Sequence, residues 1–565
     1  MEDKTTALEA DVLVLGGGLA GCNAAIGAAE GGARVVLFDK ARVKYSGDGG
    51  LGIDDHTVVH WNADITPLSP IEYIQNAYGT DQNMINPRIY ETFALENYDT
   101  LMRLHGYGVP FLEDDKFVFL SGSRKGGIWL KDASNLKPSL YNQVRKLGVK
   151  LVETTMATNL LVHDRRVVGA TGLNVHDGSF VVCTAKTTIL ATGDPQRKRD
   201  PIDNYLDPAN TGDGQAMAYR AGAELVNMEF VQFSAQQKNN RLMSSIGNVV
   251  HVVGPEAFVN WKGERFAAKR PGWTNMMWLV VREKMEGRGP VFVDITDLDE
   301  DTMRVVEDHN RSEGRYAIER WLRELRVDYR TCLIEVDLME KRLDTRYAGV
   351  LTDGHCATTI GGLYAVGEVM AGGAPEGRGA SIHCMTFGYH AGRHAAQNMA
   401  VIPDPDLSHG QIEAEKRRVY APLERKTWLR HTEVSQVVNR IVNDYAGLLN
   451  RCEGNLTMGL EYLRRVGKRI NEEASATNLH ELVRLLELYN QVQLDEMNLL
   501  SALVRRESRF KPAHYRVDLP EENNAEWLGK VVAVKKGEEG PDFEVRVPEH
   551  PGIHDVLSDI KAARN

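Results

Sequence analysis

The stretch "DVLVLGGGLAGCNAAIGAAEGGARVVLFD", residues 11–39, combines a strand, a glycine-rich turn, a helix and a second strand. Its first five residues form an apolar run typical of a strand that is covered on both faces of a parallel sheet. Gly16, Gly18 and Gly21 follow at the spacing G-x-G-x-x-G, which lets a pyrophosphate approach the N-terminus of the next helix. Asp39 ends the second strand, where an acid can accept ribose hydroxyls. This order predicts a Rossmann-like α/β domain that binds a dinucleotide.

A second glycine-rich segment, "KYSGDGGLGIDDH" at residues 44–56, follows the second predicted strand. It contains Gly47, Gly49, Gly50 and Gly52. The loss of side chains there indicates either a sharp backbone turn or the close approach of a large flat group.

Composition limits the classes of function. The chain has 565 residues, of which 42% are apolar, and this length suits about two to four domains. A net charge of −11 disfavours nucleic acid as a partner, because phosphates require a basic surface. The longest apolar run, residues 276–281, is too short to cross a bilayer. Residues 1–10 lack the basic-then-apolar pattern of an export signal, so we expect a cytoplasmic protein without membrane insertion.

The cysteines bear on metal and redox chemistry. All six are isolated in the sequence, at positions 22, 183, 332, 356, 384 and 452. Iron–sulfur clusters and structural zinc sites generally use close spacings such as C-x2-C. We therefore expect reduced core thiols and no metal site in this chain.

Three further segments identify the dinucleotide. They are "TTILATGD" at 187–194, "NTGDGQAMAYRAGAEL" at 210–225 and "GGLYAVGEV" at 361–369. In this order, and together with the first motif, they resemble the flavoprotein subunits of the succinate dehydrogenase/fumarate reductase superfamily. That superfamily also contains L-aspartate oxidase and the adenylylsulfate reductase alpha subunit. The tail "RRESRFKPAHYRVDLPEENNAEW", residues 505–527, is similar to the family as well, so the resemblance covers most of the chain.

The resemblance implies FAD as the cofactor. The positions that match the family's cofactor-binding residues are Gly16, Gly17, Gly18, Leu19, Ala20, Gly21, Asp39, Lys40, Ser46, Gly47, Gly49, Gly50, Ala157, Ala191, Thr192, Gly193, Asp213, Glu368, Ser381 and Ile382. Members with covalent flavin carry a histidine where Val43 stands in this chain. The resemblance therefore implies non-covalent FAD, and we interpret His56, the nearest histidine, as a surface or loop residue.

The resemblance also implies an α/β fold of several parts. They are a discontinuous FAD-binding domain (1–65, 135–245 and 346–405), an insertion (66–134), an α+β capping domain that closes on substrate (246–345), a helical domain (410–510) and a tail with a β-hairpin (511–565).

The family pattern is not kept at its substrate-binding positions. Trp273 stands where fumarate reductases have the proton-donating arginine, and Ser234 and Asp344 replace two carboxylate-binding histidines. A dicarboxylate would meet an acid and an indole, so succinate and fumarate are rejected as substrates. The remaining candidates are Arg378 and Arg270 as catalytic residues, and Trp273, His383 and His251 in the substrate pocket.

Three functions remain open. The leading one is an FAD-dependent oxidoreductase subunit that oxidises or reduces a non-dicarboxylate small molecule. Because the chain has no cluster-type cysteine spacing, it would exchange electrons with a separate iron–sulfur subunit of the ferredoxin type, in a homo- or hetero-oligomer. The alternatives are an adenylylsulfate reductase-like alpha subunit and a catalytically decayed flavin-binding subunit used for electron relay or assembly.

Overall fold

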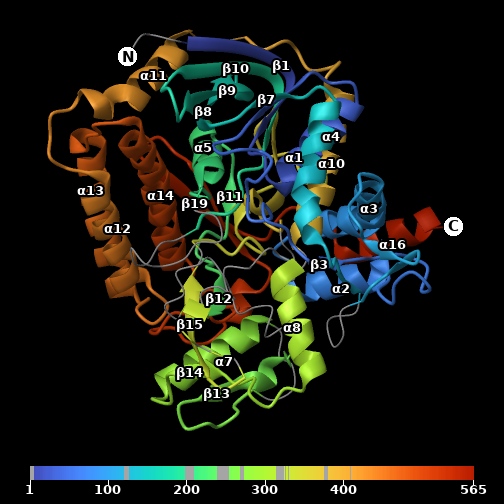
Figure 1. Cartoon of the computed structure of the whole chain (residues 1–565). Coiled ribbons are helices and arrows are strands. Elements are labelled where there is room, and N and C mark those ends of the chain that lie inside the picture. The colour runs from blue at the N-terminus through green and yellow to red at the C-terminus, as the bar shows by residue number, and fades with distance from the viewer. Residues whose placement is uncertain are drawn as a thin grey trace.

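The computed structural model describes residues 5–119, 126–196, 209–237, 253–267, 273–312, 323–324, 326, 328, 330–340, 342–373, 380–406 and 409–564. Figure 1 shows a central sheet with helices beside it, a smaller sheet-and-helix unit at one end and a row of long helices along one side. No helix in these described ranges is long and apolar enough to cross a membrane.

The central sheet has seven strands in the order β7–β2–β1–β10–β9–β8, with β17 also paired to β10. These strands are β1 (Thr5–Leu15), β2 (Val35–Phe38), β7 (Lys150–Val152), β8 (Thr155–His163), β9 (Arg166–Asn174), β10 (Phe180–Leu190) and β17 (Leu363–Ala365). β1 pairs in parallel with β2 and β10, whereas β8, β9 and β10 pair antiparallel. The predicted α/β class is confirmed, and strands from distant parts of the chain share one sheet.

Two helices from opposite ends of this domain pack closely together. They are α1 (Leu19–Glu30) and α10 (Ala380–Asn398). The contact needs glycine, because a Cβ on Gly388 would lie 2.2 Å from the Ala20 carbonyl oxygen. Around them lie α2 (Pro70–Asp81), α3 (Pro87–Gly106), α4 (Leu136–Lys146) and α5 (Asp213–Ala221), with short strands β3 (Asp55–Thr57), β4 (Leu112–Glu113), β5 (Lys116–Phe117) and β6 (Gly127–Trp129). α3 packs against α10, so the segment 66–134 covers this helix pair.

A separate antiparallel sheet forms the unit at the lower end of Figure 1, in the order β12–β15–β14–β13. Its elements are β12 (Phe233–Gln237), β13 (Phe258–Asn260), β14 (Val291–Val293), β15 (Ile334–Glu340), α7 (Trp273–Met285) and α8 (Glu300–Ser312). Met276 and Met277 of α7 are buried in this unit's own core.

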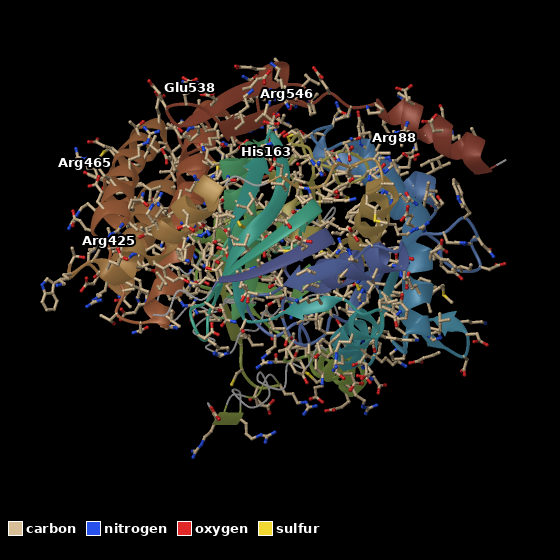
Figure 2. The ribbon with its side chains drawn as sticks, turned by 90° about the horizontal axis from the view of Figure 1, so that it is seen from above. Arg88, His163, Arg425, Arg465, Glu538 and Arg546 are labelled. Carbon is tan, nitrogen blue, oxygen red and sulfur yellow. The ribbon has the colours of Figure 1, made fainter. Side chains whose placement is uncertain are left out.

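The long helices are α11 (His409–Glu424), α12 (His431–Ala446), α13 (Glu453–Glu473) and α14 (Leu479–Val504). Leu482, Leu485 and Leu486 are buried among them, as the helical spacing of these leucines predicts. The tail forms α15 (Asn524–Trp527), β18 (Val531–Lys536), β19 (Pro541–Arg546) and α16 (Ile553–Arg564). β18 and β19 join β11 (Leu225–Val226) and β16 (Gly349–Val350) in a four-stranded sheet. Charged side chains such as Arg465 and Glu538 lie at the periphery (Figure 2).

Helix α14 has a buried polar face in addition to its leucines. Glu487, Asn490, Asp495 and Asn498 are each at most 4% exposed. Asn490 donates to the Asp213 carboxylate at 2.7 Å, beside the central sheet. Asp495 pairs with Arg342, and Asn498 donates to the Met228 carbonyl at 2.7 Å. Arg342 and Met228 lie on the two chain segments that connect the central domain to the β12–β15 unit. One helix therefore bonds to the main domain and to both of these connections.

Candidate functional site

A cavity of about 250 Å³ opens where β1, β2, β10 and β17 end. Nearly every residue predicted to bind the cofactor lines it; the exceptions are Gly21, Gly50 and Ile382. The walls also contain residues that the sequence did not single out, which are Phe38, Ala41, Asp48, Ile53, Thr155, Met156, Ala209, Asn210, Val366, Ala380 and Cys384.

The glycine-rich turn forms a cradle without side chains at the N-terminus of α1. A Cβ on Gly21 would lie 1.8 Å from the Gly16 carbonyl oxygen, so only glycine fits at that position. Gly18 is the N-cap residue and offers no side-chain cap to the first N–H groups of α1. Gly47 has φ +82°, and a Cβ on it would lie 3.0 Å from the Gly18 Cα. The two glycine-rich segments therefore face each other across a gap that suits an anionic or flat group.

Asp39 holds this turn together. Its Oδ2 accepts hydrogen bonds from the Gly17 N–H at 2.6 Å and the Ser46 hydroxyl at 2.8 Å. Its Oδ1 accepts from the Ala41 N–H at 2.6 Å. A carboxylate has about four acceptor positions, so these donors leave room for roughly one ligand hydroxyl.

Lys137 supports the same turn from below, and no sequence motif marks it. Its ammonium is fully buried and donates to the carbonyl oxygens of Gly17 and Val43, the latter at 2.5 Å. The Cys22 sulfur lies 3.3 Å away. This lysine fixes the glycine-rich turn and places a positive charge beside it, which favours an anion in the cradle.

Lys40 belongs to an ion network at the far end of the cavity. Its ammonium bonds to Thr211 at 2.9 Å, Asp213 at 2.9 Å and Glu487 at 2.8 Å. Burial opposes the charge, but the two carboxylates outweigh burial and raise the pKa of Lys40 above its ordinary value. These bonds use all three of its donors, so Lys40 lines the cavity as part of a structural network that includes α14.

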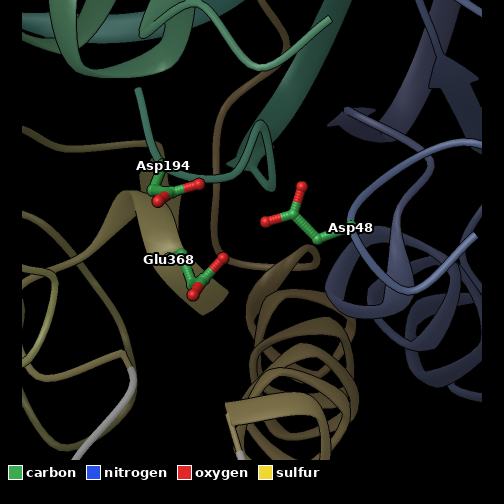
Figure 3. Close-up of side chains that lie close together, drawn as sticks. All are labelled: Asp48, Asp194 and Glu368. Atoms are coloured by element: carbon green, nitrogen blue, oxygen red, sulfur yellow. The ribbon is translucent and has the colours of Figure 1, made fainter. Parts of the chain in front are cut away.

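Three carboxylates from different segments meet on one wall of the cavity (Figure 3). Oxygens of Asp48, Asp194 and Glu368 lie within 4.8 Å of one another. Glu368 lies on the short 3-10 helix η3 (Gly367–Val369). Asn210 donates to Asp48 at 3.0 Å, and Gln196 donates to Asp194 at 2.6 Å. The sequence singled out only Glu368, because the other two acids have no spacing pattern of their own.

The histidine nearest to the glycine-rich segment is an interior residue. His56 lies on β3 and is fully buried, which corrects the expectation of a surface or loop histidine. Its Nε2 contacts the Ile53 carbonyl at 2.9 Å and its Nδ1 contacts the Ser381 hydroxyl at 2.9 Å. Burial lowers the pKa of His56 to about 4, so its ring is neutral at physiological pH. Val43 is also fully buried.

The predicted catalytic and substrate-pocket residues lie largely outside the described residues. This holds for Arg378, Arg270 and His251. Trp273 begins α7, but its side chain is also outside the described part of the chain. His383 is 1% exposed, stacks on Phe93 with ring centroids 3.6 Å apart and contacts the Tyr73 hydroxyl at 2.6 Å. The structure therefore places His383 in the packing between α10, α2 and α3, and not in the cavity wall.

The buried Asp344 is paired with a cation that the sequence analysis missed. The Arg346 Nε donates to Asp344 Oδ1 at 2.7 Å, and its Nη2 also contacts the carboxylate. Burial opposes the charge of Arg346, but Asp344 raises its pKa above the ordinary value. A substrate would therefore meet an ion pair here, and not the lone acid that we expected. The nearby sequence signal is Arg346 itself, two residues after Asp344.

Comparison with known proteins supports the cofactor site. The model of the family described as "FAD binding domain" matches residues 11–382, and that of "Fumarate reductase flavoprotein C-term" matches 435–554. An uncharacterized FAD-dependent oxidoreductase of Methanocaldococcus jannaschii is 26% identical over 93% of this chain and 96% of its own. One of the subunits of the fumarate reductase (CoM/CoB) of Methanothermobacter marburgensis is 27% identical over 95% and 98%. The adenylylsulfate reductase structure from Archaeoglobus fulgidus superposes with a TM-score of 0.86 at 22% identity, covering 97% of both chains.

Proposed function

Because the chain belongs to the succinate dehydrogenase/fumarate reductase flavoprotein family and is an FAD-dependent oxidoreductase, we propose that it transfers a hydride between non-covalently bound FAD and a small molecule that is not a dicarboxylate. Electrons would pass to or from a separate iron–sulfur subunit. FAD supplies the two-electron chemistry when it is bound.

The residues of the cavity fit this cofactor. The side-chain-free gap between Gly18 and Gly47 suits its pyrophosphate and flat ring, because no Cβ intrudes there. The Thr192 hydroxyl lines the cavity and, within the described residues, has no hydrogen-bond partner in the protein. Such a buried hydroxyl is satisfied when a ligand bonds to it. Non-covalent binding is supported by Val43 at the attachment position and by His56, both of whose ring nitrogens are already engaged.

The Asp344–Arg346 pair carries the proposal about the substrate. In the family that this chain resembles, histidines occupy the positions of Ser234 and Asp344 and hold the two carboxylates of fumarate. A buried, bidentate ion pair can offer a substrate a directed donor, but it does not supply two separate cationic clamps. Each lost contact to a carboxylate weakens both binding and the transition state. We therefore favour an organic substrate with at most one anionic group near Arg346.

Arg378 and Arg270 remain the proposed catalytic cations, with Trp273 in the substrate pocket. A cation beside the reacting atoms can donate a proton or bind an anionic group of the substrate. The proposal of a partner protein rests on the sequence, since none of the six cysteines is close enough to another to share a cluster site. It is consistent with the Methanothermobacter marburgensis relative, which is by name one component of an enzyme built from subunits.

Stopped-flow reoxidation of the reduced holoenzyme tests the substrate class. With a large excess of fumarate, the flavin is expected to reoxidise no faster than in buffer, whereas a member of a panel of monoanionic and neutral unsaturated compounds should accelerate it. Arg378→Ala should slow turnover of that compound and leave the flavin spectrum unchanged. Rapid, saturable reoxidation by fumarate would show that this substrate assignment is wrong, while leaving FAD binding untouched.

A further inference from the structure

Three histidines from two segments of the chain lie together on the outer side of α10. His390 and His394 are one helical turn apart and therefore share a face of the helix. His355 comes from the turn that follows β16. The His355 ring stacks on that of His394 at a centroid distance of 4.4 Å, and its centroid is 5.4 Å from that of His390. None of the three lines the cofactor cavity.

Neighbouring side chains already orient two of these rings. The Nδ1 of His390 contacts the Glu96 carboxylate of α3 at 2.7 Å. The Nδ1 of His394 lies 2.9 Å from the Tyr364 hydroxyl of β17. With Nδ1 donating in each ring, the lone pair is left on Nε2. A carboxylate or hydroxyl on the far nitrogen is the usual arrangement around histidines that bind metals.

We propose that His355, His390 and His394 form a surface site for a divalent transition-metal ion such as Zn²⁺ or Ni²⁺. The ligands are Nε2 of His390, Nε2 of His394 and Nδ1 of His355, with water in the fourth position. Imidazole nitrogens suit these ions, whereas Mg²⁺ and Ca²⁺ require oxygen ligands.

The spacing of the ring nitrogens suits such an ion. The His355 Nδ1 and the His390 Nε2 are 3.1 Å apart. A tetrahedral ion with bonds of about 2.0–2.1 Å holds two nitrogens about 3.3–3.4 Å apart. The rings are stacked, with planes within 7° of one another, and do not yet converge on one point. Binding therefore requires His355, which is exposed, to turn about its side-chain bonds.

The ion takes the place of a shared proton. Without metal, the contact between His355 and His390 needs one nitrogen to donate a proton to the other. On binding, that proton moves to Nε2 of His355, so no proton is released at neutral pH. The charged groups facing the cluster are the carboxylates of Glu96 and Asp353. Burial and the other two histidines lower the pKa of His394, and Asp353 opposes this effect only in part, so His394 is a neutral ligand at neutral pH.

Direct metal titration of the FAD-loaded protein tests this site. Zn²⁺ is added in competition with a chromophoric chelator, and one ion is expected per chain. Replacing His355, His390 or His394 by Gln should each weaken binding at least tenfold. Glu96→Gln should weaken it about 10- to 100-fold, because the carboxylate acts through His390. His176→Gln is the matched control, since His176 is an exposed histidine on a different turn, and it should bind like the unmodified protein.

Spectroscopy and pH separate this site from adventitious binding. The electron paramagnetic resonance spectrum of bound Cu²⁺ should show coupling to several nitrogens, and this coupling should be lost in the triple His→Gln variant. Zn²⁺ affinity should fall at least tenfold at about pH 5.5, where protons compete for imidazole. An unchanged flavin spectrum in each variant will show that the fold is intact. Equal Zn²⁺ affinity of the triple variant and the unmodified protein would overturn the proposal, and the result does not depend on which substrate the enzyme uses.

Discussion

Replacing Asp39 tests the cofactor site most directly. The Asp39→Ala variant leaves three buried donors without their acceptor, namely the Gly17 N–H, the Ser46 hydroxyl and the Ala41 N–H. It also removes the oxygen available to a ribose hydroxyl. One charge-assisted hydrogen bond contributes about 1.5–3 kcal/mol, so FAD affinity should fall about 10- to 150-fold from the ribose contact alone. Relaxation of the glycine-rich turn adds to this loss.

Fluorescence titration of the apoprotein with FAD measures this change in affinity. Asp39→Asn separates the two contributions, because its one carbonyl oxygen can still accept from Gly17 and Ser46 while the charge is lost. We expect Asn to fall between the unmodified protein and Ala. Asp177→Ala, in an exposed turn, is the matched control for loss of an acid. If Asp39→Ala bound FAD as tightly as the unmodified protein, the carboxylate would serve neither the ribose nor the turn, and the reasoning would fail.

Three further outcomes follow from the structure. Acid precipitation should release yellow FAD into the supernatant, because Val43 provides no attachment atom; colour retained by the pellet would contradict non-covalent binding. Gly21→Ala should abolish FAD binding, since its Cβ would lie 1.8 Å from a carbonyl oxygen, whereas Gly454→Ala in α13 has no atom within 4 Å and should bind normally. Burial raises the pKa of Asp81 to about 7, so the stability that the protonated acid contributes is present below about pH 4 and is lost as the pH rises through 7. Asp81→Asn should therefore stabilise the protein more at pH 8 than at pH 5 in urea unfolding experiments, and a pH-independent difference would argue against this assignment.

The fold could be predicted because its main signals are local. The strand, turn and helix around Gly16 lie within one short segment, and each glycine of the turn meets a steric need that only glycine satisfies. The same holds for the leucine spacing of α14, which follows from helical periodicity. Motif order then connected these local signals to a known architecture.

The rest of the site depends on contacts between distant parts of the chain. Lys137 reaches the glycine-rich turn from a segment without a motif, and Glu487 reaches Lys40 from 447 residues further along the chain. No spacing rule links such residues before the fold is known. His383 shows the opposite error, because its place beside a predicted cofactor loop favoured a functional role. Its stacking on Phe93 of α3 places it in the interior instead.

The polar face of α14 makes the C-terminal third of this chain inseparable from the rest. A fragment ending before residue 479 would keep Lys40 and Arg342 without the carboxylates of Glu487 and Asp495, and Glu229 without Arg505. Buried charges stripped of their partners cost several kcal/mol each, so such a fragment should fail to fold even though it holds every strand of the central sheet. Exchange of this helical region between related proteins would succeed only if both halves of each ion pair were inherited together. The chain therefore has visible domains but behaves as a single heritable module.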